Sequence, residues 1–254
     1  MRGSHLYGCS TYCCMDYTLI DALALLREKT DRIEILSDGL HDLFRDSSAC
    51  HCIDARYSVH VPGADINLAS TNERVRRTGI RVIDDLCEIC DAISATTLVV
   101  HPGYSAWRQV HADSYAALLR SLDDLAVLQA SYRVRIAPEN MGSWECCHFR
   151  SPELIRQLRE RDLDYTLDLG HAHPNGNIRM FLEEYPPVHV HLHDNGGVID
   201  DHAACGTGSV EFGEILPLLP ARVPRILEVK SPGEFEDSLD FLLNFVERPM
   251  WMDE

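Results

Sequence analysis

Short apolar runs alternate along the chain with longer stretches in which apolar residues recur every three or four positions. The first pattern is typical of buried strands, and the second of amphipathic helices. Eight short runs can be counted, and no linker interrupts the alternation, which indicates repeated β/α units around a parallel sheet. The predicted strands are residues 6–10, 32–36, 57–61, 97–101, 133–139, 164–168, 188–193 and 225–229.

The longer stretches predict helices over residues 17–29, 72–92, 114–130, 152–161 and 234–246. We predict an α/β protein, a single-domain (β/α)8 TIM barrel over residues 1–254, because about 250 residues complete eight units. An open doubly wound sheet would show the same periodicity. The barrel is favoured because polar residues collect at the ends of many strands, whereas an open sheet gathers them at one switch point.

The composition and charge of the chain limit the classes of partner that it can bind. The chain has 45% hydrophobic residues, and 40 Asp and Glu against 23 Lys and Arg give a formal charge of -17. Such a surface repels polyanions, which disfavours nucleic acid as a partner. Neither a secretory signal nor a run of the roughly 20 apolar residues of a membrane span occurs. We therefore expect a cytoplasmic protein that does not contact a membrane.

The ten cysteines lack the spacing of a structural zinc module. Cys87 and Cys90 form a C-x-x-C, but they lie in the apolar stripe of a predicted helix, so core packing is favoured over redox chemistry. The stretch 1–5 resembles the start of a common expression tag, and no function is assigned to it.

Metal-capable side chains follow the predicted strands. Six of the eight strands end in a histidine or carboxylate, and the loops add three more such residues. In a barrel these side chains converge on one face. They suit zinc, manganese or iron, and they exceed what one ion can use, so two or three divalent ions are predicted. The nine candidate ligands are His60, His101, Glu139, Asp168, His171, His191, Asp200, His202 and Glu228.

The motifs around these residues resemble those of the xylose isomerase-like barrels, which include sugar isomerases, sugar-phosphate epimerases and endonuclease IV. The markers are Ser-Val-His60-Val-Pro, His101-Pro-Gly, Glu139-Asn-Met, Asp168-Leu-Gly-His171, His191-Leu-His-Asp, Asp200-Asp-His202 and Glu228. The resemblance implies that Glu139, Asp168, His191 and Glu228 form the single-metal site of the isomerases. It implies that the other five match the additional ligands of the three-metal endonuclease site.

Neighbouring polar residues receive supporting roles. His189 and His193 share a strand face with His191, and we interpret both as structural residues or as residues that contact the ligands, rather than as ligands themselves. Asp194 is predicted to orient a ligand histidine. Asp201 could exchange roles with its neighbour Asp200.

Two loop features are candidate substrate contacts. A Gly-Thr-Gly turn at 206–208 precedes an amphipathic stretch at 211–219, so its amides could cradle a phosphate, although a simple turn explains it equally well. Trp107 and Trp144 follow two of the strand-end ligands and are candidate pocket walls, with packing as the alternative.

Two chemistries fit the ligand set. In a sugar isomerase or epimerase, Glu139 and Glu228 would be the catalytic residues, one removing a proton and the other returning it. In a phosphodiesterase like endonuclease IV, several ions would act together, and nine ligands suit that arrangement well. A non-catalytic metal-binding protein is disfavoured because the acid/base carboxylates are all present.

The predicted rim favours a small substrate. After His60 and Val61 the chain reads Pro-Gly-Ala-Asp, without the bulky side chains that endonuclease IV inserts into DNA. The loop at 37–42 is acidic. DNA affinity depends mainly on positively charged contacts to phosphate, so this loop is poorly suited to a duplex. We therefore predict a metal-dependent isomerase or epimerase of a small sugar or sugar phosphate, with hydrolysis of a phosphoester, including abasic DNA, as the alternative.

Overall fold

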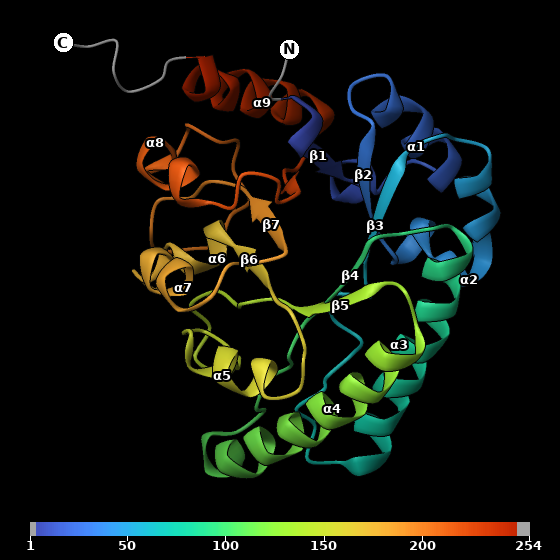
Figure 1. Cartoon of the computed structure of the whole chain (residues 1–254), viewed down its shortest axis with the longest axis vertical. Helices are drawn as coiled ribbons and strands as arrows, with labels where there is room; N and C mark the ends of the chain where they lie inside the picture. The colour runs from blue at the N-terminus through green and yellow to red at the C-terminus, as the bar shows by residue number, and fades with distance from the viewer. Residues whose placement is uncertain (1–3, 248–254) are drawn as a thin grey trace.

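Eight short parallel strands lie at the centre of the molecule, and helices surround them (Figure 1). The computed structural model describes residues 4–247, so part of the tag-like stretch 1–5 and the last residues of the predicted domain lie outside it. The strands are β1 (Tyr7–Ser10), β2 (Arg32–Leu36), β3 (Arg56–His60), β4 (Thr97–Val100), β5 (Arg135–Pro138), β6 (Thr166–Asp168), β7 (His189–Leu192) and β8 (Arg225–Leu227).

The strands follow one another around a nearly closed barrel, in the order β5-β4-β3-β2-β1-β8-β7-β6. A single parallel bridge between Glu139 and Thr166 joins the two ends of this order. The predicted single-domain (β/α)8 TIM barrel is confirmed, and the open sheet is excluded. One candidate ligand, Glu139, therefore also lies at the closure of the barrel.

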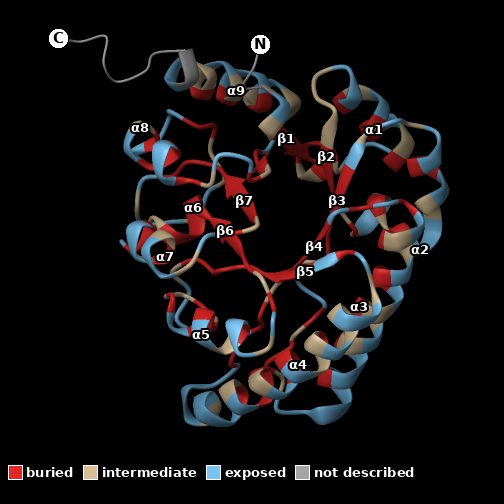
Figure 2. Cartoon of the chain, in the orientation of Figure 1, coloured by how far each residue is buried: buried red, intermediate tan, exposed pale blue. Residues whose placement is uncertain are grey.

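Helices fill the connections between strands. The helices are α1 (Leu19–Arg27), α2 (Leu43–Asp46), α3 (Glu73–Ala92), α4 (His111–Ser131), α5 (Glu153–Arg159), α6 (Leu169–Ala172), α7 (Ile178–Glu184), α8 (Phe212–Ile215) and α9 (Pro232–Glu247). Polar caps fix several starts, since Thr18 accepts from the amide of Asp21 and Asn72 from that of Arg74. Figure 2 shows buried strands at the centre and exposed outer faces on the helices.

Two predicted elements differ from the structure for local reasons, and three short helices were not predicted. The fifth strand begins at Arg135 because the amides of Arg133 and Val134 donate to Asp91 instead of a neighbouring strand. The stretch 211–219 is not one helix: α8 ends at Ile215 and a 3-10 turn follows, because Pro217 has no amide hydrogen. The short α2, α6 and α7 were not predicted.

The cysteine prediction is confirmed. Cys87 and Cys90 are fully buried on the inner face of α3, and all ten cysteines are free thiols. Within the described part of the chain, none of the helices combines the length and apolarity that crossing a membrane requires.

Candidate functional site

The nine predicted ligands meet at the mouth of the barrel, where the carboxyl ends of the strands emerge. Each lies at a strand end or in the loop that follows, so parallel strand direction brings them to one edge. They fall into three groups, of which the third also includes His193, and within each group one ligand atom per residue lies within 4.8 Å of the others. The groups are Glu139, Asp168, His191 and Glu228; His60, His101 and Glu139; and His171, His193, Asp200 and His202.

The first group, which we call the central group, is built around Nδ1 of His191. This atom lies 2.7 Å from Oε1 of Glu139, 3.7 Å from Oδ2 of Asp168 and 3.6 Å from Oε2 of Glu228. All four residues are buried. Three carboxylates so close together repel one another unless a positive charge compensates them.

Glu139 joins the central group to a pair of histidines. Its Oε1 faces His191, while its Oε2 lies 3.2 Å from Nε2 of His60 and 3.1 Å from Nε2 of His101. The two oxygens of one carboxylate thus face two different groups. This arrangement suits a carboxylate that bridges two cations.

The third group lies beside the central group. Nε2 of His171 is 3.1 Å from Oδ2 of Asp200, and Nε2 of His202 is 3.5 Å from the same oxygen. His193 belongs to this group as well, since its ring stacks on that of His202 with 4.0 Å between centroids. Its Nε2 lies 3.1 Å from Oδ1 of Asp168, so His193 also contacts the central group.

Four histidines of the mouth are oriented by backbone carbonyls. A carbonyl only accepts hydrogen bonds, so the facing Nδ1 carries the proton and Nε2 points into the site with its lone pair available in the neutral ring. This is the tautomer that a metal ligand requires. The pairs are His60 with Val61 (2.6 Å), His101 with Gly63 (3.0 Å), His171 with Asn140 (2.9 Å) and His202 with Glu228 (3.0 Å).

Without a metal, protons compensate the carboxylates. Burial alone would lower the pKa of His202, but Asp200 and Glu228 outweigh burial and raise it to about 9. Burial also opposes the charged form of His171 and of His191, yet the surrounding carboxylates overcome it and raise the pKa of both rings well above the ordinary value. The opposite holds for Glu139, where the charge of His191 overcomes burial and keeps the pKa low.

The donor set fits divalent cations. Oδ1 of Asp200 and Nδ1 of His193 are buried without a hydrogen-bond partner among the described residues, which leaves two acceptors of the third group unsatisfied. Imidazole nitrogens and carboxylate oxygens are ligands of zinc, manganese and iron. All three groups could therefore hold a cation, and the central group has the most negative charge.

Gly170 allows the backbone to pass close to the ring of His193 at the mouth. A Cβ at this position would lie 1.9 Å from Cε1 and 2.2 Å from Nδ1 of the fully buried His193. Only glycine lets the start of α6 pass this ring. The Asp168-Leu-Gly-His171 motif thus includes a packing requirement as well as two candidate ligands.

We expect Gly170→Ala to lower stability by about 1–3 kcal/mol, the usual effect of overpacking a full interior. Thermal unfolding measures the loss. Gly196→Ala is the matched control, because nothing lies within 4 Å of a Cβ there. Equal melting temperatures for the two variants would contradict this packing argument.

The structure corrects the predicted role of Asp194. Its carboxylate accepts hydrogen bonds of 2.9–3.0 Å from the backbone amides of Asn195, Gly206, Gly208 and Val210. Asp194 therefore organises the loop after β7 instead of orienting a ligand histidine.

The same contacts remove the predicted phosphate cradle. The amides of Gly206 and Gly208 donate to Asp194, and that of Thr207 donates to the carbonyl of Ala204. No amide of the Gly-Thr-Gly turn is free for a ligand, and α8 has only four residues. The alternative interpretation, a simple turn, describes this loop.

Other candidates take clear positions. Asp200 faces the histidines of the third group, whereas Asp201 is exposed. Trp144 lies at the rim, near His171 and Asp200. A Cβ added to Gly142 would lie within 4 Å of Cε3 of Trp144 and of the side chains of both other residues. Trp107 is 71% exposed, so it is not packed in the interior.

Glu34 of β2 is a buried site residue that the sequence analysis missed. It lies directly below the mouth, 2.8 Å from Nε2 of His191 and 2.7 Å from Nε2 of His189. A signal was available, because the alternation Arg32-Ile-Glu34-Ile directs Glu34 to the same side of the strand as other inward residues. It was overlooked because it lies within a strand and not at its end.

Comparison with known proteins agrees with the barrel fold. Residues 21–245 match the family model for the xylose isomerase-like TIM barrel. The uncharacterized protein MJ1614 of Methanocaldococcus jannaschii is 32% identical over 234 residues, covering 90% of this chain and 92% of its own. The probable endonuclease 4 of Mycobacterium leprae is 26% identical over 194 residues, covering 70% and 75%.

A solved structure is also similar along the whole chain. The crystal structure of a D-tagatose 3-epimerase-like protein aligns with 95% of this chain and 97% of its own, with 27% identity and a TM-score of 0.85. The match of the family model over most of the chain and the MJ1614 identity agree with the fold. The chain belongs to the xylose isomerase-like TIM barrel family.

Proposed function

We propose that this protein is a divalent metal-dependent isomerase or epimerase of a small sugar. The observation that carries the proposal is the central group, in which three buried carboxylates and one histidine meet within 4.8 Å. The similarity to a D-tagatose 3-epimerase-like protein supports the same class of substrate.

Glu139, Asp168, His191 and Glu228 would hold the cation of the central group. When bound, a divalent cation supplies a Lewis acid that fixes adjacent sugar oxygens and polarises a carbonyl group. Two further cations would be held by His60 and His101 with Glu139, and by the third group.

Glu139 and Glu228 would move the proton. They follow β5 and β8, so they approach the central group from different strands, and both lie within 4 Å of Nδ1 of His191. One carboxylate would remove a proton from a carbon next to the carbonyl, and the other would deliver a proton to the opposite face or to the neighbouring carbon. Delivery to the opposite face gives epimerisation, and delivery to the neighbouring carbon gives isomerisation.

The hydrogen bonds of the loop after β7 indicate whether the substrate is phosphorylated. Because its amides are bound to Asp194 and Ala204, it offers no phosphate cradle. We therefore favour an unphosphorylated sugar or polyol over a sugar phosphate. Trp144, 53% exposed at the rim, offers an apolar ring face against which a sugar can pack.

Hydrogen exchange tests the proposal on many candidate sugars at once. The protein, loaded with manganese, zinc or iron, is incubated in D2O with a panel of ketoses and aldoses, and loss of C–H signals is followed by NMR. A proton-transfer enzyme exchanges the hydrogen next to the carbonyl with solvent. Absence of exchange on every sugar, together with phosphate release from phosphoesters, would favour the alternative.

That alternative is phosphoester hydrolysis, and a specific observation favours it. The groups containing His60 and His202 add two candidate cation sites beside the central one, and phosphodiesterases use two or three ions. A simple isomerase needs only one.

We expect the purified protein to carry more than one zinc, manganese or iron ion per chain, because three donor groups converge. Elemental analysis of dialysed, metal-loaded protein measures this ratio. Asp200→Ala should lower it by one, since Asp200 joins His171 and His202 in the third group. A ratio of one or less in fully loaded wild-type protein would leave only the central site.

Duplex DNA with an abasic site should bind very weakly at physiological salt and should not be nicked at an enzyme-like rate. After His60 the rim carries Ala64 and Asp65, both exposed, where a wedge would be needed. The formal charge of -17 adds repulsion. Plasmid nicking measures the reaction, and efficient metal-dependent cleavage that is lost in Glu139→Gln would replace the proposed function by the alternative.

A further inference from the structure

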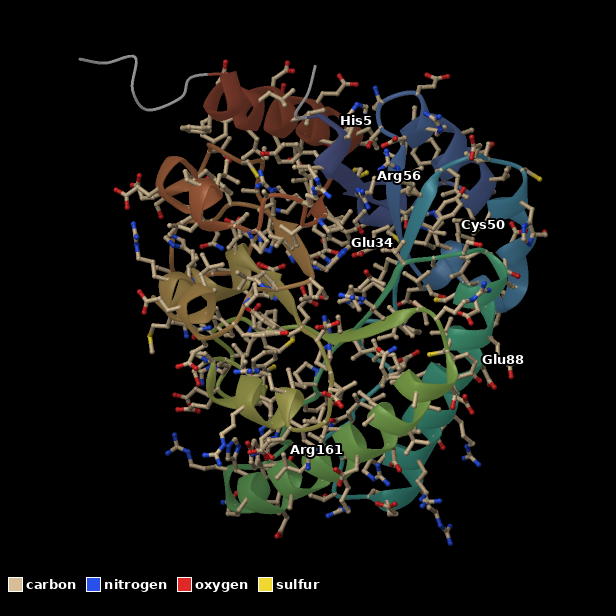
Figure 3. All side chains as sticks on the ribbon, in the orientation of Figure 1. His5, Glu34, Cys50, Arg56, Glu88 and Arg161 are labelled. Atoms are coloured by element: carbon tan, nitrogen blue, oxygen red, sulfur yellow. The ribbon has the colours of Figure 1, made fainter. Side chains whose placement is uncertain are left out.

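Below the mouth, inside the barrel, a carboxylate is fully buried between strands. Glu34 lies near the centre of the molecule (Figure 3), with no exposed surface. Its Oε1 is 2.8 Å from Nε2 of His191, and its Oε2 is 2.7 Å from Nε2 of His189 and 2.8 Å from Oγ of Ser58. Within residues 4–247, the ion pairs of Glu34 involve these two histidines alone.

Strand alternation places these residues in one layer. Glu34 of β2 pairs in register with Ser58 of β3, two residues before His60. On β7, His189 precedes His191 by two residues and therefore points to the same side. Glu34, Ser58 and His189 thus form a polar layer directly beneath the candidate ligands.

His191 connects this layer to the central group through its two ring nitrogens. Nδ1 faces the carboxylates of the central group, and Nε2 faces Glu34. Nε2 of His191 and Oε1 of Glu34 lie 2.8 Å apart as an ion pair, and neither atom has a hydrogen-bond partner among the described residues. Both ring nitrogens thus face carboxylates, which only accept, so without a cation the ring carries a proton on each nitrogen, and a cation at Nδ1 would leave the proton on Nε2 facing Glu34.

We propose that Glu34 is a positioning residue that holds the proton of His191 on Nε2, so that Nδ1 is free to bind the cation of the central group. This inference rests on the proposed metal site. Without an acceptor at Nε2, the neutral ring would carry its proton on Nδ1. There it would donate to Oε1 of Glu139, 2.7 Å away, and would occupy the position that a cation needs.

His189 and Ser58 complete the arrangement by holding the other oxygen. Both contact Oε2, which leaves Oε1 for His191. His189 therefore has a supporting role in this layer.

Zinc binding to Glu34 variants tests the proposal. Glu34→Leu removes both acceptors and should weaken zinc binding by about 10–100-fold, the usual effect of removing the partner of a ligand histidine. Glu34→Gln keeps one acceptor oxygen and should lose less. Glu88→Leu, which replaces an exposed glutamate of α3, is the control and should bind zinc as wild type does. Circular dichroism and thermal melts establish that each variant is folded.

The tautomer itself can be read in the wild-type protein. In 15N-labelled, zinc-loaded protein, NMR should show His191 protonated on Nε2, with zinc on Nδ1. A proton on Nδ1, or folded Glu34→Leu with wild-type zinc affinity, would overturn the role of Glu34. If Glu34→Leu fails to fold, folded Glu34→Gln decides, because wild-type zinc affinity in that variant would also overturn the role of Glu34. Wild-type protein that binds no zinc would overturn the proposed metal site itself, which is a distinguishable result.

Discussion

Replacing Glu228 by Gln should lower the turnover number for the sugar substrate by roughly two to four orders of magnitude, the usual scale for losing a general base. Gln keeps the size and one coordinating oxygen but removes the charge and the basicity. Glu228 lies 3.6 Å from Nδ1 of His191 and follows β8 at the mouth, so it would reach both the proposed cation and the substrate. The measurement is turnover as a function of metal concentration.

Metal dependence separates the two proposed roles of Glu228. If it transfers a proton, excess metal should leave the Glu228→Gln defect in place, whereas a residue that is only a ligand should be rescued. Asp201→Asn is the control, because Asp201 is exposed beside a candidate ligand and its replacement should keep wild-type turnover. Full activity of Glu228→Gln without added metal would exclude both roles, and a thermal melt confirms that the variant is folded.

The metal-free protein should lose stability as pH rises from about 6.5 to about 9. A histidine whose folded pKa is raised stabilises the fold fully below its unfolded value of 6.5, and this contribution is lost as pH rises through the folded value, about 9 for His202. Several histidines of the mouth shift in this direction, so the melting temperature should fall by on the order of 10 °C.

The carboxylates whose pKa values are lowered affect the stability of the fold in acid. Glu139 and Asp200 have folded pKa values below their ordinary ones, so their contribution is present near neutral pH and is lost only in acid. Over the alkaline interval the histidines therefore decide the trend.

With metal bound, the stability of the protein should instead increase as pH rises. A cation requires neutral histidines, so protons compete with it and its stabilisation grows with pH. Scanning calorimetry of chelator-treated and metal-loaded protein from pH 6.5 to 9 makes the comparison. His202→Gln should flatten the metal-free trend, whereas His51→Gln, which replaces an exposed histidine, should not. A metal-free protein whose melting temperature rises over this interval would contradict the electrostatic account of the mouth.

Much of the fold followed from local patterns. Apolar runs such as Thr97–Val100 and the stripe of Glu73–Ala92 are the signals of a buried strand and of an amphipathic helix, and the physics of burial converts them into these elements. Element ends were less predictable. Whether Arg133 belongs to a strand depends on Asp91, a residue of another element that no local pattern identifies.

The sequence by itself determined the barrel and the edge at which the nine candidate ligands meet, because parallel strands send their carboxyl ends to one face whatever their exact register. Only the tertiary structure decided the partners of each polar group. Glu34 beneath His191, and Asp194 on the amides of Gly206 and Gly208, depend on strand register and loop path. Such contacts join residues far apart in the chain, and a hydrogen bond forms only when both atoms are placed within about 3 Å of each other.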